Sequence, residues 1–310
     1  LDEFRERHGW FADLALSQGL DDKSMGREPV LAKARRTALT AIVGFTAFIS
    51  LLVVGFVLGI VAVVLLATGK IKGAYRPHLP GGSVYLEVFL LFIAGFLLLP
   101  LLSGVVSGIA GGADYSRLLI WLLLLIPFWA MLRGARASDF RNAMGWHAGK
   151  GLFREIFAGV IGYVACLPIF LGGIGLTLLT MIIVSFFQSG DDGGAPTHPI
   201  LNEVDPNDLW SVIGVYAVAS VWAPIVEESL FRGALYHHMR GRLHPILAGL
   251  GVAFIFAVIH PQGLVAIPAL MSLAVVFALL REWRGSLIAP VVAHAMHNGA
   301  LMTCLILALS

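Results

Sequence analysis

Six residues in the last third of the chain have side chains that could do chemistry, although apolar residues surround them. They are Glu227, Glu228, Arg232, His260, His294 and Asn298. An ionisable group inside a membrane span costs about 2.5–3.5 kcal/mol on insertion scales, so its presence requires a reason. A carboxylate in apolar surroundings suits a general base near neutral pH, and an amide suits the place where negative charge develops. These residue types suit general acid–base chemistry with a donor for developing negative charge.

The two adjacent glutamates are predicted to have different partners. Glu228 and Arg232 are four residues apart, so they share one face of a helix. Glu before Arg is the favoured order, and pairing spares both groups an unpaired burial. Adjacent helical residues diverge by about 100°, so Glu227 points elsewhere and remains available.

The other polar groups are predicted to meet Glu227 from two further helices. His294 and Asn298 are also four apart and form one polar patch, whereas His260 belongs to a different apolar segment. Counted at about 1.5 Å per residue from the neighbouring basic turns, these groups and Glu227 lie at similar depth. A single cluster is therefore expected.

Two chemistries stay open for this cluster. Glu227, His260 and His294 could bind zinc and leave a position open for water. Alternatively, Glu227 could activate water without a metal. The chain has no HExxH sequence, so the common zincin arrangement is absent.

Composition places these residues in a membrane protein. The chain has 310 residues, of which 58% are hydrophobic and 13% charged, with a mean hydropathy of +0.86. Soluble domains have about 45–50% apolar and about 25% charged residues. The net charge of +2 without a basic cluster argues against nucleic-acid binding. Cys166 and Cys304 lack CxxC spacing, so neither a disulfide framework nor a thiolate metal site is expected.

The predicted fold is all-α, a polytopic membrane protein with about eight transmembrane helices. A span needs about 20 apolar residues. The fifth segment contains charged residues and is longer than a bilayer core, so it must tilt, protrude or break at Pro224. The expected spans are residues 38–68, 84–110, 116–132, 153–187, 209–239, 244–260, 263–280 and 286–309.

Four regions follow from this pattern. Residues 1–37 are a polar leader, 38–187 are N-terminal transmembrane helices, 188–208 are an acidic Gly/Pro loop, and 209–310 carry the polar cluster. An amphipathic stripe in the leader could face the membrane, but a solvated tail with a regulatory or orienting role is the expected interpretation. The members of the stripe are Phe4, Trp10, Phe11, Leu14 and Leu16.

The distribution of Lys and Arg predicts the orientation of the short loops. The turns within residues 240–242 and 281–284 should face the cytoplasm, and the loops 70–76 and 133–150 fit the same side by parity. The acidic 188–208 loop should face the other side.

Three blocks of the C-terminal third resemble a known family. EESLFR at 227–232, FAVIH at 256–260 and HAMHN at 294–298 are similar to the EExxxR, FxxxH and HxxxN signatures of the CPBP family. That family comprises the type II CAAX prenyl endopeptidases and the bacterial Abi-type membrane proteins. The resemblance covers about residues 205–310 and is closest to the prokaryotic branch.

The resemblance implies an intramembrane protease of about eight helices with a polar cavity. By matching position, Glu227 would activate the attacking water, with His260 and His294 beside it. Asn298 would hold the developing oxyanion. The second Glu and the Arg of the first motif would support these groups. Residues 1–200 match no motif of the family.

Three of the histidines that have no role in the motifs lie within or close to the motifs in the sequence. We expect them to lie at helix interfaces or to orient their neighbours. They are His237, His238 and His297.

The predicted function is an intramembrane endopeptidase that hydrolyses a peptide bond near the membrane surface. Its substrate would be a membrane-anchored peptide or protein, in CAAX-type or leader-peptide processing, and its location a bacterial plasma membrane. The alternative is a non-catalytic membrane protein, either a binding or immunity factor or an ion or metal carrier using the same cluster. A carrier would be expected to show related halves, and no internal repeat is visible.

Overall fold

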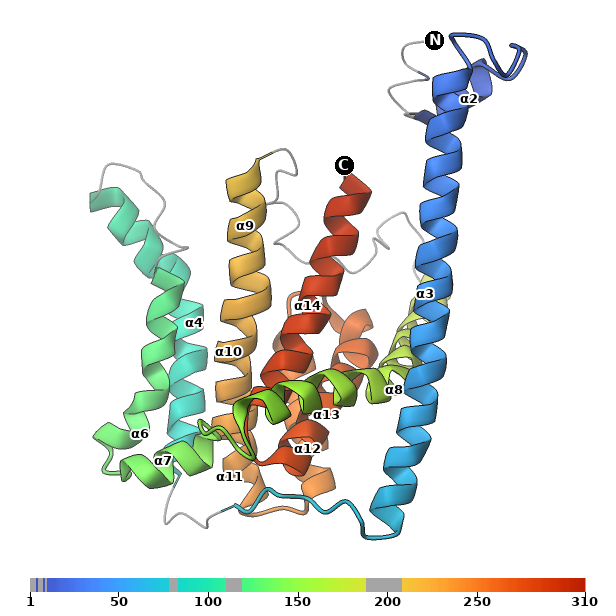
Figure 1. Cartoon of the computed structure of the whole chain (residues 1–310). Helices are drawn as coiled ribbons and strands as arrows, with labels where there is room; N and C mark the ends of the chain where they lie inside the picture. The colour runs from blue at the N-terminus through green and yellow to red at the C-terminus, as the bar shows by residue number, and fades with distance from the viewer. Residues whose placement is uncertain are drawn as a thin grey trace. The chain divides into compact units, whose positions relative to one another are not determined.

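A computed structural model describes residues 10–77, 83–109, 119–187 and 208–309, together with Phe4 and His8. Every regular element within these residues is a helix (Figure 1). The chain divides into two compact units, Leu1–Val54 and Gly55–Ser310. The predicted all-α class is confirmed, and the chain is an integral multi-pass membrane protein.

The first unit contains a short helix and the start of a long one. Helix α2 is Trp10–Leu16, and α3 is Glu28–Ala67. Helix α3 begins ten residues before the predicted span because an acidic first turn and the helix formers that follow extend the helix beyond its apolar part. In α2, Phe11 and Leu16 are exposed, and membrane contact by the leader stays a prediction.

Each apolar segment predicted to span the membrane is helical in the part that the structure describes. Within the described residues, five helices are long and apolar enough to cross a membrane, and two apolar helices are shorter, 120–132 and 245–259. The amphipathic helix α7 (Ala137–Met144) lies between the third and fourth segments. The remaining elements are α4 (Val84–Ile109), η1 (Ile120–Phe128), α6 (Trp129–Leu132), α8 (Leu152–Phe187), α12 (Pro245–Ile259), η5 (Leu264–Ala266), α13 (Ile267–Arg284) and α14 (Ile288–Leu309).

The fifth segment is one continuous helix that contains two wider π turns. It runs through α9 (Leu209–Ala217), η3 (Val218–Trp222), α10 (Ala223–Glu228), η4 (Ser229–Leu235) and α11 (Tyr236–Arg240). It does not break at Pro224. That proline occupies the first turn of α10, directly after η3. A proline has no backbone N–H to donate, and the wider π turn before it allows the helix to continue. Figure 1 shows this column beside α14.

Helix α13 packs closely against α8. A Cβ at Gly173 would lie 2.1 Å from Ser272 Oγ, so only glycine permits this approach. The main core contains Phe231 and Phe256, and a second cluster around α13 contains Phe277.

The predicted basic turns lie at one end of the second unit. The Ala74 N–H donates to the Glu282 carbonyl at 2.9 Å, and the Leu287 N–H donates to the Gly145 carbonyl at 3.0 Å. Arg240 pairs with the Glu282 carboxylate at 2.6 Å. These contacts bring the four basic segments together, while the side that faces the cytoplasm stays a prediction. Of the 188–208 loop, only its last residue lies within the described residues.

Candidate active site

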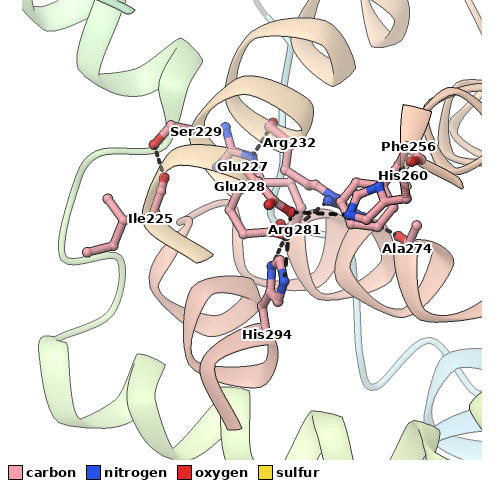
Figure 2. Close-up of polar contacts among 10 residues, drawn as sticks. All are labelled: Ile225, Glu227, Glu228, Ser229, Arg232, Phe256, His260, Ala274, Arg281 and His294. Carbon is pink, nitrogen blue, oxygen red and sulfur yellow. Dashed lines mark hydrogen bonds and ion pairs between the residues drawn. The ribbon is translucent and has the colours of Figure 1, made fainter. Parts of the chain in front are cut away.

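Three helices bring the predicted cluster together. Glu227 lies on α10, His294 lies on α14, and His260 follows the last residue of α12. Glu227 Oε2 is 3.8 Å from His260 Nε2 and 3.9 Å from His294 Nε2 (Figure 2). The depth argument from the sequence therefore identified groups that meet in space.

Both histidines are oriented through their Nδ1 atoms. His260 Nδ1 lies 2.6 Å from the Phe256 carbonyl, and His294 Nδ1 lies 3.0 Å from Glu228 Oε1. These oxygens only accept, so each Nδ1 carries the proton and donates it. In the neutral rings, the Nε2 lone pairs therefore face Glu227. The Nε2 atoms of the two imidazoles and the Glu227 carboxylate therefore converge on one point.

Glu227 keeps one carboxylate oxygen without a partner. Its Oε2 is buried and makes no hydrogen bond within the part of the chain that the structure describes. The Glu227 side chain is 21% exposed, whereas that of His294 is 4% exposed. A buried polar atom without a partner costs free energy, so such an atom indicates a place for water or a substrate group.

Glu228 and Arg232 form the predicted pair at the back of the cluster. Arg232 Nη1 lies 3.0 Å from Glu228 Oε1, and both side chains are fully buried. Arg232 Nη2 also donates to the Ala274 carbonyl at 2.9 Å, which connects η4 to α13. Because the same Oε1 atom accepts from His294, the pair orients that ring.

Aromatic rings form the apolar walls of the site. Phe277 stacks on His294 with ring centroids 4.8 Å apart, and Phe256 lies 4.0 Å from His260 by the same measure. The sequence indicated Phe256 through its motif, but no pattern indicated Phe277. These rings exclude water from one side of each imidazole, which strengthens nearby electrostatic interactions.

Asn298 has a structural partner that the sequence did not predict. In η3 the Ala223 N–H bonds to the Val218 carbonyl, and Pro224 has no N–H. The Ala219 carbonyl therefore lacks its usual partner, and Asn298 Nδ2 donates to it at 2.7 Å. One of the two amide protons is used in this way, and the second remains available.

Two of these three histidines, His237 and His297, lie in contacts between elements, and His238 contacts a residue in the turn after its own helix. His297 Nδ1 is 3.0 Å from the Tyr163 hydroxyl on α8, and His237 Nδ1 is 2.6 Å from the Tyr75 hydroxyl. His238 contacts Arg242 at the end of α11. The contacts of His237 and His297 fit the predicted interface role.

A second polar contact holds the loop after α7 against the fifth segment. The sequence did not predict this contact. Trp146 Nε1 donates to Ser229 Oγ at 3.0 Å, and that hydroxyl donates to the Ile225 carbonyl at 2.7 Å. The contact joins residues 83 positions apart. No local pattern could have indicated it.

The geometry was also compared with that of a metal centre. Within the described residues, no group of three or more His, Cys, Asp and Glu side chains is arranged to hold a metal ion. Glu227, His260 and His294 meet at distances that leave room for a small polar group, but they do not form such a ligand set.

The part of the chain that carries this site also resembles a known family. Residues 209–300 match the family described as Type II CAAX prenyl endopeptidase Rce1-like. This segment is similar to the CAAX protease family. The segment contains all six predicted site residues, and the resemblance noted from the three motifs is confirmed for it. No curated protein and no solved structure matches the chain.

Proposed function

We propose that the chain is an intramembrane endopeptidase in which Glu227 activates water for hydrolysis of a peptide bond near the membrane surface. One observation carries the proposal. The unpartnered Glu227 Oε2 lies within 3.9 Å of two imidazole Nε2 atoms whose rings are fixed from behind. The CAAX protease match supports the reaction class.

The first half of the reaction forms a bond between water and the substrate carbonyl carbon. A water beside Glu227 Oε2 donates one proton to the carboxylate and its other hydrogen to an imidazole Nε2. As the oxygen attacks, Glu227 takes the proton, and the carbonyl oxygen becomes an oxyanion. The second amide proton of Asn298 is the proposed donor to that oxyanion.

The second half breaks the carbon–nitrogen bond. Glu227 returns its proton to the departing amine, and the tetrahedral intermediate collapses to a carboxylic acid. Glu228 and Arg232 keep their charges and hold the His294 ring throughout. No net proton is gained or lost by the site.

The proposed substrate is a membrane-anchored peptide or protein of the CAAX or leader-peptide type. Two observations support this class: the family match and the position of the cluster between helices of a multi-pass membrane protein. A substrate attached to the bilayer reaches such a site by lateral diffusion.

Peptide hydrolysis by the purified protein in proteoliposomes tests the proposal. The panel contains CAAX-type and leader-type membrane-anchored peptides. Glu227→Gln keeps the side-chain shape but removes the base, so we expect kcat to fall by about 10²–10⁴-fold. Glu87→Gln is the control because Glu87 is a carboxylate paired with Arg133 at 3.0 Å, on α4. The control should retain the wild-type rate.

A chelator arm addresses the zinc alternative. The glutamate mechanism requires that a zinc chelator leave the rate unchanged, whereas restoration of a lost rate by added zinc would favour a metal-bound water. If no peptide in the panel is cleaved by folded protein, the non-catalytic binding or carrier function becomes the better explanation.

A further inference from the structure

Arg281 is a buried cation at the end of α13. The charge pattern placed it in a cytoplasmic turn, but the side chain is fully buried. Its guanidinium donates to three carbonyl oxygens, those of Arg232 at 3.3 Å, Ala143 at 2.8 Å and Gly285. It also lies over the Tyr75 ring, 4.5 Å from the centroid. One side chain therefore joins four segments of the second unit.

The contact with Arg232 compensates for a π turn. In an α-helix the Tyr236 N–H would bond to the Arg232 carbonyl, but in η4 it bonds to the Phe231 carbonyl. Arg281 Nε supplies a donor to the displaced carbonyl. Asn298 has the same relation to the Ala219 carbonyl in η3. Each π turn beside α10 is thus held by a polar side chain from another helix.

This contact is connected to the active-site ring. Arg281 holds the backbone of Arg232, the Arg232 side chain holds Glu228, and Glu228 holds His294 Nδ1. A shift in the backbone at Arg232 would therefore move the acceptor that orients His294.

The loop after α7 is shaped around the guanidinium. Gly145 has φ +76°, and a Cβ there would lie 2.2 Å from Arg281 Nη1. The Gly145 carbonyl also accepts from the Leu287 N–H, which closes the turn between α13 and α14 over the side chain. Only glycine suits both the backbone conformation and the space.

We propose that Arg281 is a positioning residue that fixes η4, so that Arg232 and Glu228 hold His294 in its working orientation. Its role in turnover rests on the proposed peptidase function. Lys cannot replace it, because an ammonium lacks the planar fork of donors that reaches three carbonyls.

Two readouts test the proposal on the full-length protein in nanodiscs. The first is ¹⁵N NMR of labelled histidine, with the His294 signals assigned by their loss in His294→Gln. The second is peptide cleavage, with kcat and KM measured separately. In Arg281→Lys and Arg281→Met, we expect the His294 Nδ1 resonance to shift and kcat to fall by up to about a hundredfold at unchanged KM.

Arg284→Met is the matched control. Arg284 lies at the same helix end and pairs with Glu155 at 2.7 Å, with no contact to the η4 backbone in the described structure. This variant should keep the His294 resonance and kcat. Gly145→Ala displaces the guanidinium without removing its charge and should shift the resonance in the same direction as Arg281→Lys.

The outcomes separate the two proposals. An unchanged His294 resonance in folded Arg281→Lys and Gly145→Ala would overturn the positioning role, as would an equal shift in Arg284→Met. If Arg281→Met does not fold, those two variants decide the question. Absence of cleavage by the wild type would count against the peptidase function alone, because the NMR comparison needs no substrate.

Discussion

Removing one member of the buried pair of Glu228 and Arg232 should lower the free energy of unfolding far more than removing both members. The two charges are 3.0 Å apart and have no solvent exposure. At an effective dielectric constant of about 20, their attraction is about 5.5 kcal/mol, which offsets a desolvation cost of several kcal/mol per ion. Removing one partner leaves the other charge buried, so Glu228→Gln and Arg232→Met should each lower the free energy of unfolding by about 3–5 kcal/mol.

The double variant separates this effect from a general loss of packing. Without either charge no desolvation cost remains, so Glu228→Gln/Arg232→Met should be more stable than either single variant and close to the wild type. The free energy of unfolding would be measured by SDS titration in mixed micelles. Additivity of the single effects within about 0.5 kcal/mol would refute the reasoning, because it would mean that the two groups do not interact.

Two further predictions concern helix packing and acid stability. Gly173→Ala should lower the free energy of unfolding by about 1–3 kcal/mol because its Cβ would overlap Ser272, as measured by the same titration. The neighbouring Gly172→Ala meets open space and should be neutral or slightly stabilising; equal effects of the two would contradict the close α8–α13 contact. Burial lowers the pKa of His147 in the loop after α7, and the nearby Arg281 charge lowers it further. As pH falls through about 6.5, the unfolded state therefore takes up a proton that the native state does not, and stability decreases. His147→Gln should flatten this decrease between about pH 5 and 6.5, whereas an unchanged profile would show that other groups cause it.

The sequence alone predicted the helical segments and the members of the candidate site. Long apolar runs must satisfy their backbone groups internally in a bilayer, so they predict helices without reference to neighbours. The pair of Glu228 and Arg232 was also predictable because residues four apart on one helix meet wherever that helix packs. The convergence of Glu227, His260 and His294 followed from equal depth in three spans.

Only the tertiary structure decided how these groups are held. The π turns on both sides of α10 depend on donors from other helices, Asn298 for the Ala219 carbonyl and Arg281 for the Arg232 carbonyl. Spacing along the chain contains no information about such contacts, which join residues 79 and 49 positions apart.

Arg281 shows most clearly why the sequence could not predict these contacts. A basic residue at the end of an apolar helix is compatible with solvent at the membrane surface and equally with burial among carbonyl oxygens. The charge pattern predicted only that the turn with Arg281 faces the cytoplasm, because local sequence reports only the position along the helix. The loop at Gly145 and the π turn at Arg232 together form a buried site for the guanidinium, and that site exists only after distant segments have packed.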